Sequence, residues 1–335
     1  PLTITLADLV LGFPIAPSDA VIRRDWVQKM DLANRTLAWT GGEILFFGGA
    51  YLNGCEFRAV NRATNYRRHH SGRIIRDLAG GCAAEIAAQD TIFEDPRCPP
   101  DVLALRDVAH ANMLQLWGYR ALVQEETALG QAFLREAVRK NPSLLGGTPC
   151  PLTSFLLVNA IDDEHIDHQQ RLKLVSDQLP SDMPQLPAQL QDAVGHGYVL
   201  KGARAVMWER PTDGRAHFDE ARRSGVTIGA WVLQHMTSSL LNYEIEFGAT
   251  AADKVLRGWM TELGRIDRQN VARQLAASYL VNRAFDSYKN GQFGEVPAKV
   301  LRAAANDPWY LTNRGVLSIL LKSIATRSRG RQAGH

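Results

Sequence analysis

Residues 273–324 read RQLAASYLVNRAFDSYKNGQFGEVPAKVLRAAANDPWYLTNRGVLSILLKSI and decide the fold class. Apolar residues recur at helical spacing in the first part, and Asn290-Gly291 then ends the helix, because glycine readily takes the left-handed conformation of a helix end. A second apolar set runs to Asp307, which precedes a proline and is therefore disfavoured in a helix. The stretch predicts two helices joined by a glycine turn. The inward-facing residues are Leu280, Ala284, Phe285, Tyr288, Phe293, Val296, Val300, Ala303 and Ala304.

The same arrangement occurs twice earlier in the chain. Ala137, Ala221 and Ala303 are separated by 84 and 82 residues, and small residues are favoured where two paired helices cross closely. The pattern resembles tetratricopeptide units of about 34 residues, so each period has room for two helix pairs. We therefore expect a mainly α fold with a tetratricopeptide-like helical repeat array; the alternative is an irregular helical bundle. The marking residues are Gly118, Gly130, Leu134, Ala137 and Pro142, then Gly202, Gly214, Phe218 and Ala221, then Ala284, Val296, Val300, Ala303 and Pro308.

Composition restricts the class of protein. The 335 residues are 45% hydrophobic and 22% charged, as in soluble globular proteins. A net charge of +3 does not favour a nucleic-acid partner. No apolar run reaches the roughly 18 residues of a membrane span, and no secretory signal opens the chain. The four cysteines form no C-x-x-C pair, so we expect free thiols and a cytoplasmic protein. Because the chain begins with Pro1, we expect processing or a larger product.

Four regions are predicted along the chain. Residues 1–75 are rich in glycine and aromatic residues, with a helix expected near 43–53, a strand near 56–60 and a strand-like run at 20–22. Residues 76–99 form a connecting helix and a proline-broken linker. Residues 100–325 form the helical repeat domain, interrupted by loops at 162–168 and 179–189. Residues 326–335 read as a disordered basic tail.

The first region resembles the end of the catalytic domain of bacterial family 2 glycosyltransferases, which have an A-type α/β fold. PIAPSDAVIRRDWV, GGEILFFGGAYLNGCEF and NRATNYRRHHSGR match three successive segments of that family in order and spacing. The remaining helical sequence resembles the C-terminal extensions of such bacterial enzymes. The resemblance implies that residues 1–75 are a partial glycosyltransferase-like α/β segment.

The resemblance also assigns functional residues. Glu43 falls on the acidic residue that serves as catalytic base in inverting members, and Arg23, His69, His70 and Arg73 are candidate substrate-binding residues. Glu43 also fits a purely structural role, because an acidic side chain is favourable in the first turn of a helix. The basic cluster around His69 and His70 also fits a solvated loop.

Two departures from the family pattern stand out. Gly42 replaces the first member of the family's acidic pair, and the first 75 residues contain no D-x-D motif. The nucleotide-binding half and its divalent metal would precede Pro1, so no cofactor or metal is expected in this chain. We therefore expect the isolated chain to be inactive and to bind sugar nucleotides weakly.

Other chemistry-bearing residue types have structural interpretations. The acidic and histidine residues at 162–168 include metal-ligand types but match no metal-binding motif, so a solvated loop is expected. Five aromatic residues at helix-packing positions are expected in the core; the alternative is that some line the concave surface of the array. They are Trp117, Trp208, Tyr243, Trp259 and Tyr279.

Two functions remain open from the sequence. The first is sugar transfer from a nucleotide sugar to an unidentified acceptor, with the helical domain binding the acceptor, a protein partner or a second copy. The alternative is a non-catalytic helical-repeat scaffold for protein interaction that carries a degenerate catalytic remnant. The genomic sequence upstream of Pro1 discriminates between them, since an intact D-x-D about 100 residues upstream favours the enzyme.

Overall fold

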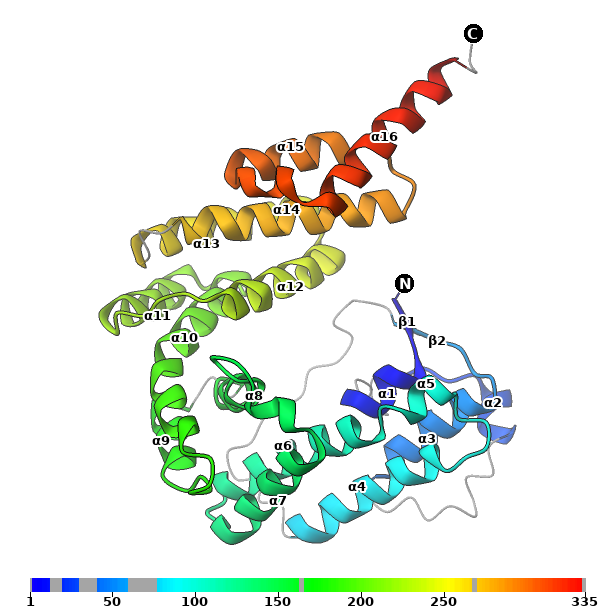
Figure 1. Cartoon of the computed structure of the whole chain (residues 1–335), viewed down its shortest axis with the longest axis vertical. Helices are drawn as coiled ribbons and strands as arrows, with labels where there is room; N and C mark the ends of the chain where they lie inside the picture. Colours follow the sequence, from blue (N-terminus) through cyan, green and yellow to red (C-terminus); the bar gives the residue numbers. More distant parts are fainter. Residues whose placement is uncertain are drawn as a thin grey trace. The chain divides into compact units, whose positions relative to one another are not determined.

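The computed structural model describes residues 2–12, 20–29, 41–59, 77–162, 166–266 and 270–332. These residues are mainly α-helical, and their helices pack in pairs beside one small two-stranded sheet (Figure 1). No strand follows Ala59 in the described ranges, which confirms the expected fold class at this level. The elements are β1 (Leu2–Ile4), α1 (Leu6–Gly12), α2 (Arg24–Lys29), α3 (Gly42–Leu52), β2 (Phe57–Ala59), α4 (Leu78–Phe93), α5 (Pro100–Leu103), α6 (Arg106–Val123), α7 (Thr127–Lys140), η2 (Pro142–Leu145), α8 (Pro151–Ala160), α9 (His168–Ser176), α10 (Gln185–Met207), α11 (Pro211–Arg223), α12 (Ala230–Phe247), α13 (Ala249–Ile266), α14 (Val271–Lys289), α15 (Val296–Asn306), η3 (Pro308–Thr312) and α16 (Arg314–Gln332).

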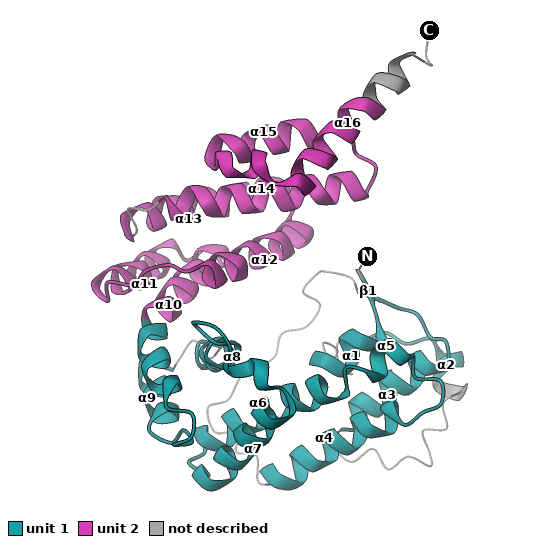
Figure 2. Ribbon diagram, viewed as in Figure 1, with its two compact units in different colours: residues 1–194 teal, residues 195–335 magenta. Residues whose placement is uncertain are grey.

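The chain divides into two compact units, residues 1–194 and 195–335 (Figure 2). Helix α10 begins in the first unit and continues into the second. The four regions expected from the sequence were defined by sequence pattern rather than by contacts, so their boundaries stay a prediction.

The first unit opens with the small sheet. β1 pairs antiparallel with β2, with Leu2 opposite Ala59 and Ile4 opposite Phe57. Helix α3 and strand β2 confirm the helix and strand expected in this part of the sequence. The strand expected at residues 20–22 is wrong: the segment is irregular and leads into α2. An isolated β run needs a neighbouring strand for its backbone groups, and the described sheet has only β1 and β2.

Helices α1, α3, α4 and α6 share the core of this part of the first unit. Phe47 of α3 is fully buried there, and Ile92 of α4 is 2% exposed. The last carbonyls of a helix lack partners within the helix. At the end of α1, two amide side chains donate hydrogen bonds to such carbonyls. Gln89 Nε2 donates to the Val10 carbonyl at 2.8 Å, and Asn112 Nδ2 donates to the Leu11 carbonyl at 2.9 Å.

Three helix pairs cross where side chains are small: α6 with α7, α10 with α11, and α14 with α15. A Cβ built on Gly130 would lie 3.2 Å from the Gly118 carbonyl oxygen. In the second pair, a Cβ on Gly214 would lie 3.1 Å from the Gly202 carbonyl oxygen. The third pair places Ala284, which is fully buried, at the corresponding position. Backbones therefore approach closely at these crossings.

The turns between the paired helices have the same hydrogen bonds. Each has a residue with positive φ, which is Glu125 (62°), Glu209 (58°) or Gly291 (73°). The amide of the following residue donates five positions back, as in the Schellman motif. The three bonds are Glu126 N to Ala121 O at 2.9 Å, Arg210 N to Ala205 O at 2.9 Å, and Gln292 N to Ser287 O at 2.8 Å.

Two expectations about irregular segments are corrected. The loop expected at 179–189 ends earlier, because α10 begins at Gln185. Pro187 is compatible with this start. Proline has no backbone N–H, and the N–H groups of the first helical turn have no partner within the helix. The backbone of the expected disordered tail is helical to Gln332, and this part contains arginine and glutamine, which are good helix formers.

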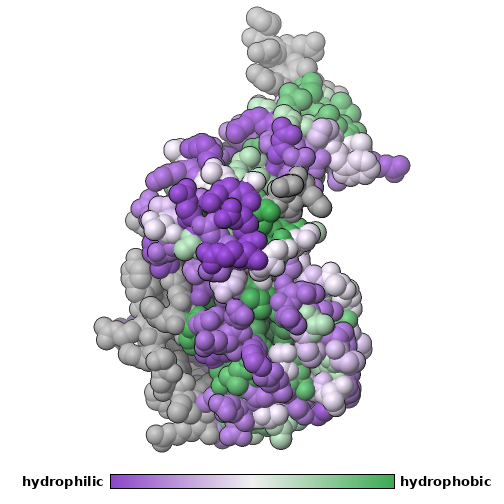
Figure 3. Space-filling view, turned by 90° about the vertical axis from the view of Figure 1, so that its left-hand side faces the viewer, coloured by the Kyte–Doolittle hydropathy of each residue, from purple (hydrophilic) through white to green (hydrophobic). Residues whose placement is uncertain are grey.

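Several hydrophobic side chains are exposed near the end of the second unit. Figure 3 shows hydrophobic surface over the part of this unit formed by α16. Leu321 and Ile324 of that helix are 65% and 47% exposed, and Trp309 of η3 is 76% exposed. No described helix combines the length and the apolar character needed to cross a bilayer.

Candidate functional site

Glu43 lies in the first turn of α3, and its side chain is exposed. The helix begins after Gly41, which has a φ of +85° and packs against α4. A Cβ there would lie 2.6 Å from the Ala84 carbonyl oxygen, so no other residue fits without a shift of the backbone. The buried Gly42 follows. The close approach of Gly41 to α4 thus fixes the start of α3, where Glu43 is presented to solvent.

A second carboxylate, that of Glu85 on α4, lies in the same electrostatic neighbourhood. The pKa of Glu85 is raised, chiefly because burial disfavours its charged form and additionally because of the negative charge of Glu43. The hydrogen bond from Trp117 and the positive charge of Arg120 act in the opposite direction. Helices α3 and α4 therefore place two acidic groups within interacting range, and one of them holds its proton more tightly than an ordinary glutamate.

Trp117 and Arg120 of α6 complete this group. Trp117 Nε1 donates to Glu85 Oε2 at 2.7 Å, and the Arg120 guanidinium lies 4.8 Å from the centre of the Trp117 ring. A Cβ on Gly81 would lie 2.3 Å from the ring, so glycine makes room for it. Burial, followed by the charge of Glu85, raises the pKa of the neighbouring Cys82 thiol to about 12. The thiol is therefore protonated and has little nucleophilic character.

Sequence reasoning did not single out Glu85 or Arg120 and assigned Trp117 only to the core. Trp117 is indeed buried, with 2% of its surface exposed. The available signal was an acidic residue in the small-residue helix GGCAAEIAA. Its contact with an indole of another helix could not be read from the local sequence.

Arg23 lies elsewhere. Its guanidinium is 79% exposed and pairs with Asp25, with Nη2 2.9 Å from Oδ2. Burial is the main cause of the raised pKa of Cys55, and the charges of Asp25 and Arg23 also act on this thiol. Cys55 follows the C-terminal end of α3, whereas Glu43 is at its N-terminal end, about 15 Å away at 1.5 Å per residue. The structure does not bring Arg23 and Glu43 together.

The remaining candidates, His69, His70 and Arg73, lie outside the described residues. The acidic segment at 162–168 is described only in part. Asp167 accepts the Gln169 amide at 2.9 Å and caps α9, and His168 Nε2 lies 3.0 Å from the Val194 carbonyl. These two side chains therefore have structural partners. No group of three His, Cys, Asp or Glu side chains suited to a metal occurs in the described part of the chain.

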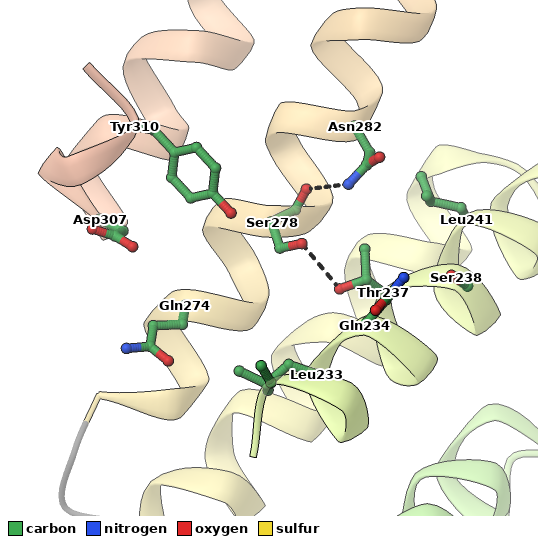
Figure 4. Close-up of a pocket in the computed structure, with 11 residues that line it drawn as sticks. Leu233, Gln234, Thr237, Ser238, Leu241, Gln274, Ser278, Asn282, Asp307 and Tyr310 are labelled. Carbon is green, nitrogen blue, oxygen red and sulfur yellow. Dashed lines mark hydrogen bonds between the residues drawn. The ribbon is translucent and has the colours of Figure 1, made fainter. Parts of the chain in front are cut away.

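The second unit contains a groove between α12 and α14, closed on one side by η3 (Figure 4). Its volume is about 400 Å³, within the range of ligand-binding sites. Thr237 Oγ1 donates to Ser278 Oγ at 3.3 Å and links the two helices across the floor. The lining residues are Ala230, Leu233, Gln234, Thr237, Ser238, Leu241, Gln274, Ser278, Asn282, Asp307 and Tyr310.

Comparisons with protein-family models, with curated proteins and with solved structures found no match to this chain.

Proposed function

We propose that the chain contains the acceptor-side end of a family 2-like glycosyltransferase domain, followed by tetratricopeptide-like helix pairs that bind the acceptor or a protein partner. Glu43 is the catalytic base in this proposal. The observation that supports it most is the exposed carboxylate of Glu43 at the start of α3, whose negative charge also acts on the pKa of Glu85.

The family resemblance implies the following reaction. The acceptor hydroxyl oxygen attacks the anomeric carbon of the nucleotide sugar, and the bond from that carbon to the diphosphate breaks. The hydroxyl proton moves to the Glu43 carboxylate as the new bond forms. The family resemblance implies a divalent metal in the nucleotide-binding half. The described residues bring no three metal-ligand side chains together, so they do not fit a metal and no step is assigned to one.

Glu85 has a supporting role in the same proposal. Trp117 fixes the direction of its carboxyl group through the hydrogen bond to Oε2. Burial raises the pKa of Glu85, so this carboxyl group holds its proton more tightly than an exposed glutamate.

A sugar-transfer assay on the full natural gene product tests the proposal. Glu43→Gln should lower kcat by about 10²- to 10⁴-fold, the usual contribution of a general base. Glu126→Gln is the matched control, because Glu126 is also exposed and also lies at the start of a helix. Equal activity of the wild type and Glu43→Gln, or no transfer with any nucleotide sugar, would remove the proposal.

A second candidate function is a non-catalytic helical scaffold. The groove between α12 and α14 favours it, because a ligand-sized concave site lies in the second unit, whereas Glu43 belongs to the first. A natural product that transfers no sugar and yet binds a ligand through this groove would support the scaffold.

A further inference from the structure

The end of the second unit exposes apolar side chains on three elements that pack together, α15, η3 and α16 (Figure 1). Val316 and Ile319 of α16 are buried in a core shared with α14 and α15. Leu321 and Ile324 lie three residues apart on another flank of the same helix and stay 65% and 47% exposed. The apolar surface of α16 is therefore wider than the part that its own chain covers. The exposed apolar side chains of the three elements are Leu301, Trp309, Leu311, Leu321 and Ile324.

The same part of the sequence is strongly basic. Residues 296–335 contain seven lysine and arginine residues and a single acidic residue, Asp307. With histidine neutral, their net charge of +6 exceeds the +3 of the whole chain, so the preceding residues are net negative. Positive charge is thus concentrated at one end of the sequence, where it attracts anionic partners.

The cations beside the exposed apolar side chains have no acidic partners. Lys299 pairs with Glu295 at 2.6 Å. Arg302, Arg314 and Lys322 are exposed, and they form no ion pair with any residue that the structure describes. Each of these three lies within three residues of an exposed apolar side chain. A partner of this surface therefore has to supply both negative charge and an apolar environment.

A helix of the same unit that packs against protein has a different charge pattern. Helix α13 packs on α12 and α14 and contains both signs of charge, with Asp253 and Glu262 as well as Lys254 and Arg257. Helix α16 contains no acidic residue in its 19 residues. Exposed tryptophan and leucine side chains together with lysine and arginine are typical of elements that lie on a membrane surface. Anionic headgroups attract the cations, and the boundary with the acyl chains accepts the apolar side chains.

We propose that the surface formed by α15, η3 and α16 binds peripherally to a bilayer that contains anionic lipids. Trp309, Leu321 and Ile324 enter the boundary between headgroups and acyl chains, while Arg302 and Lys322 contact lipid phosphates. A second copy of the chain docked through the same surface would bring two groups of like charges together, which opposes that alternative. The proposal goes beyond sugar transfer and is independent of the catalytic base and of the groove between α12 and α14.

Co-sedimentation of the intact chain with vesicles tests the proposal. One set of vesicles is pure phosphatidylcholine, and the other contains about 30% phosphatidylglycerol, which supplies the negative surface potential. At about 0.1 M salt, the chain should bind the anionic vesicles at least about 10-fold more tightly. Raising the salt concentration to about 0.5 M should weaken this binding, because salt screens the attraction between the cations and the headgroups.

Single substitutions separate the two contributions. Lys322→Ala should weaken binding to the anionic vesicles about 5-fold, the effect of one charge near such a surface. Leu321→Ser and Trp309→Ser should each weaken it about 5- to 20-fold, because less apolar area leaves water. Ile245→Ser and Lys254→Ala are the matched controls, since both residues are exposed in the same unit but lie outside this surface. They should leave binding unchanged, and circular dichroism confirms that each variant is folded.

Several results would overturn the proposal. Equal binding to both kinds of vesicle would do so, and so would binding to neither. Wild-type binding by both Leu321→Ser and Trp309→Ser would show that the cations adsorb without insertion of apolar side chains. A chain that dimerises through Leu321 in sedimentation equilibrium and binds no vesicles would assign the surface to a second copy. Glu43→Gln should bind vesicles like the wild type, so the absence of sugar transfer would remove only the enzyme.

Discussion

Trp259 of α13 donates a hydrogen bond from Nε1 to the backbone carbonyl of Ala203 in α10 at 2.9 Å, and the Trp259 side chain is fully buried. The bond ties α13 to the helix that crosses α11. It also satisfies an indole N–H that would otherwise be costly to bury. Trp259 therefore joins α13 to α10 beside the place where α10 and α11 cross at their glycines.

Replacing Trp259 with phenylalanine should destabilise the second unit. The change keeps an aromatic ring but removes the donor to Ala203 and leaves a space, and the lost hydrogen bond alone costs about 0.5–1.5 kcal/mol. Urea unfolding measures the difference in free energy. Trp309→Phe is the control, because Trp309 is 76% exposed and surface changes are usually within about 0.5 kcal/mol. Equal stability of Trp259→Phe and the wild type would show that the contact with Ala203 is unimportant.

The raised pKa of Glu85 predicts a specific pH dependence. Below the ordinary range of a glutamate, near pH 4.3, the group is protonated in both the folded and the unfolded chain. As pH rises above that value, the unfolded chain loses this proton first, so the free energy of unfolding falls until the folded-state pKa is passed. Glu85→Gln should remove this loss of stability. Trp117→Phe should raise the Glu85 pKa further, because the indole hydrogen bond lowers it.

Carboxyl-detected NMR titration of Glu85, together with urea unfolding between pH 4 and 7, checks both statements. A Glu85→Gln profile that retains the wild-type slope would contradict the assignment. A downward shift of the Glu85 titration in Trp117→Phe would show that the indole does not stabilise the carboxylate.

The turns between paired helices offer a third prediction. Glu125 and Glu209 have positive φ where the third pair has Gly291. A non-glycine residue in this conformation destabilises the fold by about 1–2 kcal/mol. Glycine avoids this strain, but ordering it from the unfolded chain costs about 0.5–1 kcal/mol and offsets part of the gain. Glu209→Gly should therefore stabilise the protein by up to about 1 kcal/mol, and Gly291→Ala should destabilise it. Thermal and urea unfolding measure both changes.

The control for this prediction is Glu126→Gly. Glu126 follows Glu125 in the first of these turns, but its φ is −80°, so glycine relieves no strain there. It should lower stability slightly. If Glu209→Gly and Glu126→Gly have the same sign, the positive φ of Glu209 is not a source of strain.

Helical content and the positions of the crossings were predictable from the sequence because they depend on local patterns. Leu134, Phe218 and Val300 were among the residues that mark the repeated pattern, and their exposed fractions are 0%, 1% and 0%. The assignment of Trp208 to the core was wrong, since its side chain is 56% exposed. It follows the end of α10, where the Arg210 guanidinium lies 5.2 Å from its ring centre. A polar partner of this kind lets a large aromatic residue remain at the surface.

The candidate sites were less predictable because their residues meet across helices. Glu43 could be chosen by resemblance, but its electrostatic partner Glu85 is 42 residues away and on another helix. The groove residues Gln234 and Gln274 are ordinary exposed glutamines in the sequence. Their chemistry depends on the packing of α12 beside α14, which places both along one concave surface. Local periodicity predicts which face of a helix is buried, but it does not predict which helix packs against that face.

Gly214→Ala tests most directly the central claim, that the helix pairs depend on close backbone contact at their crossings. The new Cβ would lie 2.8 Å from Val206 Cγ2 and 3.1 Å from the Gly202 carbonyl oxygen, and overpacking of this kind costs about 1–3 kcal/mol. Gly264→Ala is the matched control, since that helical glycine has nothing within 4 Å and alanine should stabilise its helix by about 0.5–1 kcal/mol. The account predicts opposite signs for the two variants in urea unfolding. A stabilising Gly214→Ala, equal to Gly264→Ala, would contradict it.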